Sequence, residues 1–145
     1  MKIKGNYKFK ADQQTVWDLF NSQESLARNL PGCESLLETE PGKYDAVVTI
    51  GVAGIKGTYE GKVELAEPDP PNFYRLVGEG GGKPGFVKGE AAIKFSTDGQ
   101  NTVVDYNADV QIGGLIAGVG QRMLGGISKM MLGQFFKKMA KELKS

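Results

Sequence analysis

Residues 55–65 read Ile-Lys-Gly-Thr-Tyr-Glu-Gly-Lys-Val-Glu-Leu, and this stretch decides the fold. Apolar residues and glycines take every odd position, while charged residues and one threonine take the even positions. A period of two predicts a strand with one face on a core and the other in solvent. Glycine inside a strand often marks a sharp bend or a close approach by another group. The stretch therefore predicts a curved strand beside a core or a cavity.

The same alternation extends in both directions along the chain. Residues 2–10 alternate lysine or asparagine with apolar residues or glycine. Further strands are predicted near residues 34–40, 43–52, 73–82, 86–97 and 102–112. Because short turns join these consecutive strands, we expect them to pair antiparallel, in one sheet of about six to seven strands.

Helical periodicity surrounds the strands. Asp12 is a suitable N-cap for a helix over residues 13–20, and Asn21 with Glu24 resembles a capping box for a second short helix. From Leu115 to about residue 143 the apolar period returns to 3.6, which predicts a long C-terminal helix. We therefore expect an α+β fold in a single domain over residues 1–145, its curved antiparallel sheet wrapped around that helix.

Composition excludes several classes of function. A net charge of +1 gives no indication of nucleic-acid binding. The chain has no histidine and one cysteine, which removes the commonest general base and any cysteine-based metal cluster. We predict no catalytic set, no metal and no cofactor. The first ten residues lack the apolar core of a signal peptide, so we expect a cytoplasmic protein.

The glycine-rich strands and the methionine-rich helix together suggest a cavity between sheet and helix. Glycines leave space, and methionine adapts to irregular apolar surfaces. The predicted apolar walls are Trp17, Tyr59, Phe86, Tyr106, Met123, Ile127, Met130 and Phe135. A polar group inside it is predicted from Arg75, Glu79 and Glu90. The alternative is that the glycines serve curvature alone and the helix fills the space.

Lysines gather on the polar side of the predicted C-terminal helix. They are Lys129, Lys137, Lys138, Lys141 and Lys144. A basic helix can rest on an anionic membrane or bind an acidic partner. The alternative is a solvated face whose charges complement the helix dipole.

Several segments carry a family resemblance. They are residues 16–20 (Val-Trp-Asp-Leu-Phe), 30–34 (Leu-Pro-Gly-Cys-Glu), the glycine-rich 78–86, 106–110, 113–114 and 135–136. With the order of elements, they resemble the helix-grip fold of the START and Bet v 1-like (polyketide cyclase-like) superfamily. More narrowly, the whole chain resembles the family of the carbon monoxide dehydrogenase G-subunit.

The resemblance implies a non-enzymatic accessory protein that holds a lipid or quinone-like molecule between sheet and helix. It also implies an association with a molybdenum hydroxylase and a place at the inner face of the membrane. A pure protein or membrane adaptor with a filled core is the first alternative. A START-like cyclase or hydrolase is the second, and it would need polar residues inside the cavity.

Overall fold

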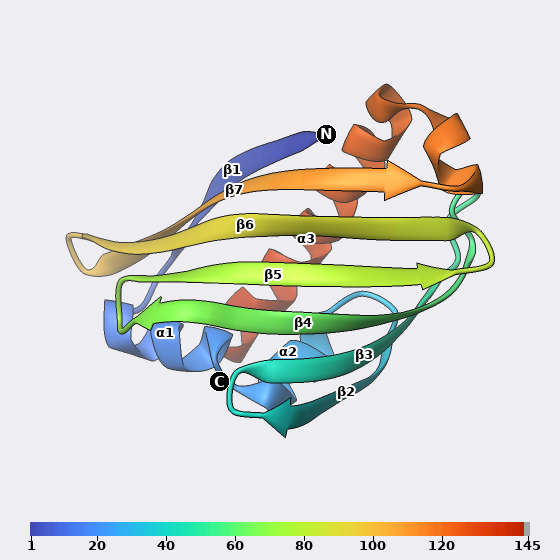
Figure 1. Ribbon diagram of the computed structural model, residues 1–145. Helices are drawn as coiled ribbons and strands as arrows, with labels where there is room; N and C mark the ends of the chain where they lie inside the picture. Colours follow the sequence, from blue (N-terminus) through green and yellow to red (C-terminus); the bar gives the residue numbers. More distant parts are fainter. Residues whose placement is uncertain (144–145) are drawn as a thin grey trace.

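Figure 1 shows the computed structural model, which describes residues 1–143. The elements follow in the order β1 (Lys2–Phe9), α1 (Gln13–Phe20), α2 (Gln23–Asn29), β2 (Cys33–Glu40), β3 (Lys43–Ile50), β4 (Gly57–Asp69), β5 (Phe73–Gly82), β6 (Gly85–Asp98), β7 (Asn101–Gly113), the 3₁₀ helix η1 (Leu115–Val119) and α3 (Gln121–Glu142). The α+β prediction is confirmed, with two short helices after the first strand and a long helix at the end.

Within the described residues, the strands form one antiparallel sheet of seven in the order β1-β7-β6-β5-β4-β3-β2. Helix α3 crosses one face of this sheet; on that side α1 lies near one end of the sheet and α2 lies beside its β2 edge (Figure 1). We call this the inner face and the opposite one the outer face. The alternation in residues 55–65 holds, because Tyr59 faces inward while Glu60 and Lys62 are exposed on the outer face.

Two helix starts test the capping predictions. Asp12 caps α1 as predicted, since the Thr15 amide donates to its carboxylate at 2.7 Å. The prediction of Asn21 as the cap of α2 is wrong by one residue. Ser22 takes that position and accepts from the Ser25 amide, while Asn21 closes the end of α1.

The C-terminal helical segment is divided. Gly120 has a φ of +96°, a conformation that favours glycine, and it separates η1 from α3. The helix predicted from Leu115 therefore begins at Gln121 and reaches Glu142. Among residues 1–143, no helix has the length and apolar character required to cross a membrane.

The core is a cluster of aromatic rings near one end of the sheet. Phe136 of α3 stacks on Tyr7 at 5.3 Å between ring centroids and on Tyr106 at 5.5 Å. Trp17 of α1 meets Phe95 edge-on at 5.1 Å. The second half of α3 is therefore committed to this core. Buried members of the cluster include Phe9, Val16, Phe20, Tyr74, Phe135 and Met139.

The end of α3 is tied to α2 through Glu142. Its carboxylate accepts from Arg28 at 2.5 Å, from Ser25 at 3.2 Å and from the Asn29 amide. Burial by itself would raise the pKa of Glu142, but hydrogen bonds from Arg28, Asn29 and Ser25, with the charge of Arg28, outweigh it and lower that pKa.

We expect this tie to weaken in acid. Because the folded pKa of Glu142 lies below its unfolded value, its contribution is present at neutral pH and is lost as pH falls through the folded pKa. Glu142→Gln should lower the free energy of unfolding by roughly 1 kcal/mol at pH 7 and reduce its fall below pH ~4.5. Urea unfolding between pH 7 and pH 3 measures both. An unchanged acid slope in the variant would contradict the assignment.

Candidate functional site

A cavity of about 310 Å³ lies between the inner face of the sheet and the first half of α3. Its sheet wall consists of Ile3, Val48, Ile50, Tyr59, Gly80, Val87, Val110 and Ile112. Its helical wall consists of Ile116, Leu124, Ile127, Ser128 and Met131, and Met1 and Ile55 complete the lining. The lining is almost wholly apolar, and the volume is at the lower end of the roughly 300–1,000 Å³ usual for small-molecule sites.

Strand register explains why aliphatic side chains gather here. Val87 of β6 lies between Gly80 of β5 and Ile112 of β7 in the sheet, so the three share the inner face. Val48 lies opposite Tyr59 in the same way. Gly80 leaves a gap in this row because it has no side chain, and the neighbouring Gly61 is pressed against the main chain of β5. The glycines thus create both space and close strand packing.

A small apolar cluster closes one end of the cavity. Ile55 from the β3–β4 loop, Ile116 of η1 and Leu124 of α3 are each less than 8% exposed and pack together. The Tyr59 hydroxyl donates to the Ile55 carbonyl at 2.5 Å and thereby holds the loop against the cavity. Burial raises the pKa of Tyr59, so this hydroxyl stays protonated at neutral pH.

Of the eight predicted cavity residues, the cavity contains Tyr59 and Ile127. Trp17, Tyr106 and Phe135 lie in the aromatic core instead. They contact other rings of the core because α1 and the second half of α3 pack against the sheet there.

The prediction is wrong for Phe86, Met123 and Met130, which are 54%, 57% and 46% exposed. Phe86 faces outward because Val87 takes the inner position on β6. The two methionines lie on the solvent side of α3 because Leu124, Ile127 and Met131 turn toward the sheet.

The prediction of a polar group inside the cavity is also wrong. Arg75, Glu79 and Glu90 lie on the outer face, because Tyr74 on β5 and Ala91 on β6 are the buried neighbours that face inward. Arg75 donates to Glu67 at 2.6 Å and lies 3.8 Å from Glu90. Arg75 and Glu90 therefore approach each other on the exposed surface, and none of the three residues lines the cavity.

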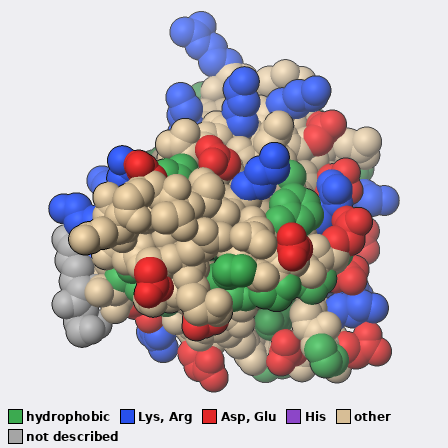
Figure 2. Space-filling view, turned by 90° about the vertical axis from the view of Figure 1, so that its left-hand side faces the viewer, with side chains coloured by type: hydrophobic (Ala, Val, Ile, Leu, Met, Phe, Trp, Pro, Cys, Tyr) green, Lys and Arg blue, Asp and Glu red, His purple; other side chains and the backbone are tan. Residues whose placement is uncertain are grey.

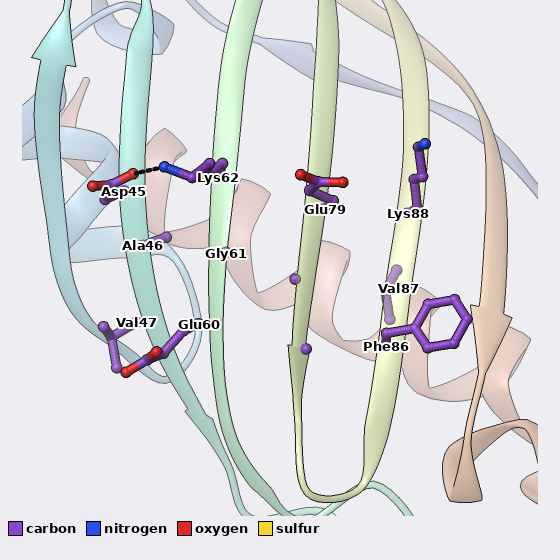
Figure 3. A pocket seen from close by; sticks show the side chains of 12 residues that line it. Asp45, Ala46, Val47, Glu60, Gly61, Lys62, Glu79, Phe86, Val87 and Lys88 are labelled. Atoms are coloured by element: carbon purple, nitrogen blue, oxygen red, sulfur yellow. Dashed lines mark hydrogen bonds and ion pairs between the residues drawn. The ribbon is translucent and has the colours of Figure 1, made fainter.

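The outer face carries an open hollow of about 650 Å³, shown in Figure 3. A row of alternating charges crosses it from Asp45 through Lys62 and Glu79 to Lys88, with Asp45 and Lys62 paired at 3.3 Å. Figure 2 shows acidic and basic side chains mixed along its right-hand side, where the outer face is seen edge-on. Cross-strand pairs of opposite charge account for this row, so the hollow is a weaker candidate than the apolar cavity.

The predicted basic surface lies on the side of α3 that faces away from the sheet. The exposed lysines of α3 are Lys129, Lys137, Lys138 and Lys141, and Lys144 lies outside the described residues.

Sequence reasoning missed four aliphatic residues of the sheet that line the cavity, Val48, Val87, Val110 and Ile112. Their signal was available, because each is an inward position in an alternating strand.

Comparisons with known proteins agree with this architecture. The family model for the carbon monoxide dehydrogenase G-subunit (CoxG) matches residues 5–144. A crystal structure of a conserved protein from Geobacillus kaustophilus is 34% identical, with a TM-score of 0.96 over 99% of this chain and 95% of that one. A search of the curated proteins found no match.

More distant structures share the fold. A START superfamily protein from Mycobacterium smegmatis is 13% identical, with a TM-score of 0.76 over 99% of this chain and 97% of that chain. The Zhui aromatase/cyclase from Streptomyces sp. R1128 is 14% identical, with a TM-score of 0.74 over 99% and 93%. These likenesses confirm the predicted START-like helix-grip fold.

Proposed function

The chain belongs to the carbon monoxide dehydrogenase CoxG family, and from this premise we propose that it is a non-enzymatic accessory protein that binds a hydrophobic ligand. The ligand, a lipid or quinone-like molecule, occupies the cavity between the sheet and α3. In this role the protein links a molybdenum hydroxylase of the carbon monoxide dehydrogenase type to the membrane.

The observation that carries the proposal is the apolar cavity itself. Aliphatic side chains from β1, β3, β6 and β7 and from both helical segments surround one space. Shielding a large apolar side chain from water is worth about 1.5–3 kcal/mol, so a ligand that covers several of them gains substantial binding energy. A filled core, as in the pure adaptor, would leave no such space.

The enzyme alternative finds less support in the lining. Among residues 1–143, the cavity contains no Asp, Glu, Lys or Arg side chain, and the charged residues proposed for such a role lie on the outer face. The Zhui aromatase/cyclase shares the fold with this chain, and that likeness carries no activity over.

Native mass spectrometry of the purified protein tests the ligand directly. We expect a mass increment corresponding to one apolar molecule per chain, released by organic solvent and identified in the extract. A protein that is empty after gentle purification, and that takes up no added lipid or quinone, would remove the proposal and favour the adaptor.

The exposed side of α3 supports membrane contact. Its charged residues, Arg122, Lys129, Lys137, Lys138 and Lys141, are all basic, and Met123 and Met130 lie among them. Lysines near an anionic bilayer are worth about 1 kcal/mol each, and apolar side chains can enter the interface. This helix also forms one wall of the cavity, so contact would place the cavity beside the lipid.

We expect Lys137→Glu with Lys141→Glu to weaken binding to phosphatidylglycerol-containing vesicles by at least about tenfold. Co-sedimentation measures the bound fraction. Lys62→Glu with Lys88→Glu makes the same change in net charge on the outer face of the sheet and serves as the control. Equal losses from the two double variants would mean that overall charge, and not this helix, governs binding.

A further inference from the structure

The cavity has a specific hydrogen-bonding character. Among the described residues, two polar side chains line it, Tyr59 and Ser128. The Tyr59 hydroxyl donates its hydrogen to the Ile55 carbonyl at 2.5 Å, and the Ser128 hydroxyl donates to the Leu124 carbonyl at 2.8 Å. A hydroxyl has one hydrogen and two acceptor lone pairs. Both groups therefore have accepting capacity left and no hydrogen to offer.

Backbone N–H groups around the cavity likewise donate their hydrogens to acceptors within the protein. The amide of Ile116 donates to Pro84 at 2.8 Å, and that of Leu124 donates to Gly120 at 3.0 Å. The amide of Ile55 donates to Val52 at 3.2 Å. In the sheet wall, Gly80 and Val87 take part in ladders with strands on both sides. Carbonyl oxygens retain a second lone pair after one bond, so the main chain adds acceptors rather than donors.

We infer that the cavity selects apolar ligands that carry a hydroxyl donor, such as a long-chain alcohol, a phenol or the hydroquinone form of a quinone, over their ether or carbonyl analogues. This inference rests on the proposed function and names the ligand class. A ligand hydroxyl finds acceptors at Tyr59 and Ser128. A ligand carbonyl buried there loses its bonds to water and finds no side-chain donor, which costs affinity.

The α-amino group of Met1 is the competing influence. It donates to the Val110 carbonyl at 2.7 Å, and Met1 borders the cavity at the β1 side. An ammonium group has three hydrogens, so it would favour ligands that accept hydrogen bonds. The ratio of the affinities for a hydroxyl compound and its methyl ether therefore shows whether the ligand contacts the acceptors Tyr59 and Ser128 or the Met1 ammonium.

A matched pair of probes tests the inference. The probes are 4-octylphenol and 4-octylanisole, which differ only in that a methyl group replaces the hydroxyl hydrogen. Their affinities are measured by displacement of a fluorescent apolar dye. We expect the phenol to bind at least about fivefold more tightly. Tyr59→Phe with Ser128→Ala keeps most of the apolar wall and should reduce this ratio to less than about twofold, while circular dichroism confirms folding.

The outcomes separate the inference from the proposed function. If both probes bind equally well, or the anisole binds better, the donor preference is wrong and the apolar binding function stands. A preference that persists undiminished in the double variant overturns the assignment to Tyr59 and Ser128. If neither probe displaces the dye and no ligand is extracted from the protein, the proposed function itself fails.

Discussion

Replacing Ile127 by tryptophan is expected to abolish ligand binding and leave the protein folded. Ile127 lies on α3 with its side chain in the wall of the 310 Å³ cavity, where an indole ring would occupy the space of the ligand. Losing the contacts of even one large apolar group costs about 1.5–3 kcal/mol, which corresponds to a loss of affinity of roughly tenfold or more. Native mass spectrometry and dye displacement measure the bound fraction and the affinity.

Met123→Trp is the matched control, because it places the same ring on the same helix but on the solvent side. We expect wild-type ligand binding from this variant. If Ile127→Trp retained full binding, the ligand would occupy another site, and the hollow on the outer face would be the next candidate. If both variants lost binding, a general disturbance of α3 would explain the loss.

Much of the fold was predictable because its signals are local. Alternation placed the strands within a few residues, and glycine or proline marked the turns between them. The signals that failed depended on finer geometry. Ser22 rather than Asn21 caps α2, and the positive φ of Gly120 divides a segment whose apolar pattern continues through it. Neither detail changes the 3.6-residue period, so periodicity gave no indication of it.

The cavity was predictable in principle but was assigned to the wrong residue types. The prediction places large aromatic residues and methionines in its walls, whereas the aromatic residues Trp17 and Phe135 fill the core. A ring fills space efficiently, so close packing draws rings together. Smaller aliphatic residues such as Val87 and Ile112, beside a glycine, leave space unfilled. Sequence alone could not show which end of the sheet each set would occupy, because this depends on the crossing of α3.

The prediction that Arg75, Glu79 and Glu90 face inward was wrong for a related reason. A strand has two faces, and choosing between them requires the phase of the alternation. On β5, four glycines obscure that phase in residues 78–82, since glycine is compatible with either face. The register with β4, where Lys62 lies opposite Glu79, resolves it.

Phe136→Ala is expected to lower the free energy of unfolding by about 3–5 kcal/mol, the usual cost of removing a buried phenylalanine ring. Phe136 is 6% exposed and contacts rings from both β1 and β7, so its loss leaves a cavity that these strands cannot readily close. For a chain of this size the melting temperature should fall by roughly 10 °C. Urea unfolding and calorimetry measure the two quantities.

The same variant tests whether core and cavity are separate. The first half of α3 contributes Leu124, Ile127 and Met131 to the cavity, and the second half contributes Phe136 to the core. Below its melting temperature, Phe136→Ala should therefore bind ligand with wild-type affinity, whereas Ile127→Trp should be stable but empty. The exposed Met130→Ala should change stability by no more than about 0.5 kcal/mol. Loss of ligand affinity in folded Phe136→Ala would show instead that the aromatic core and the cavity form one continuous site.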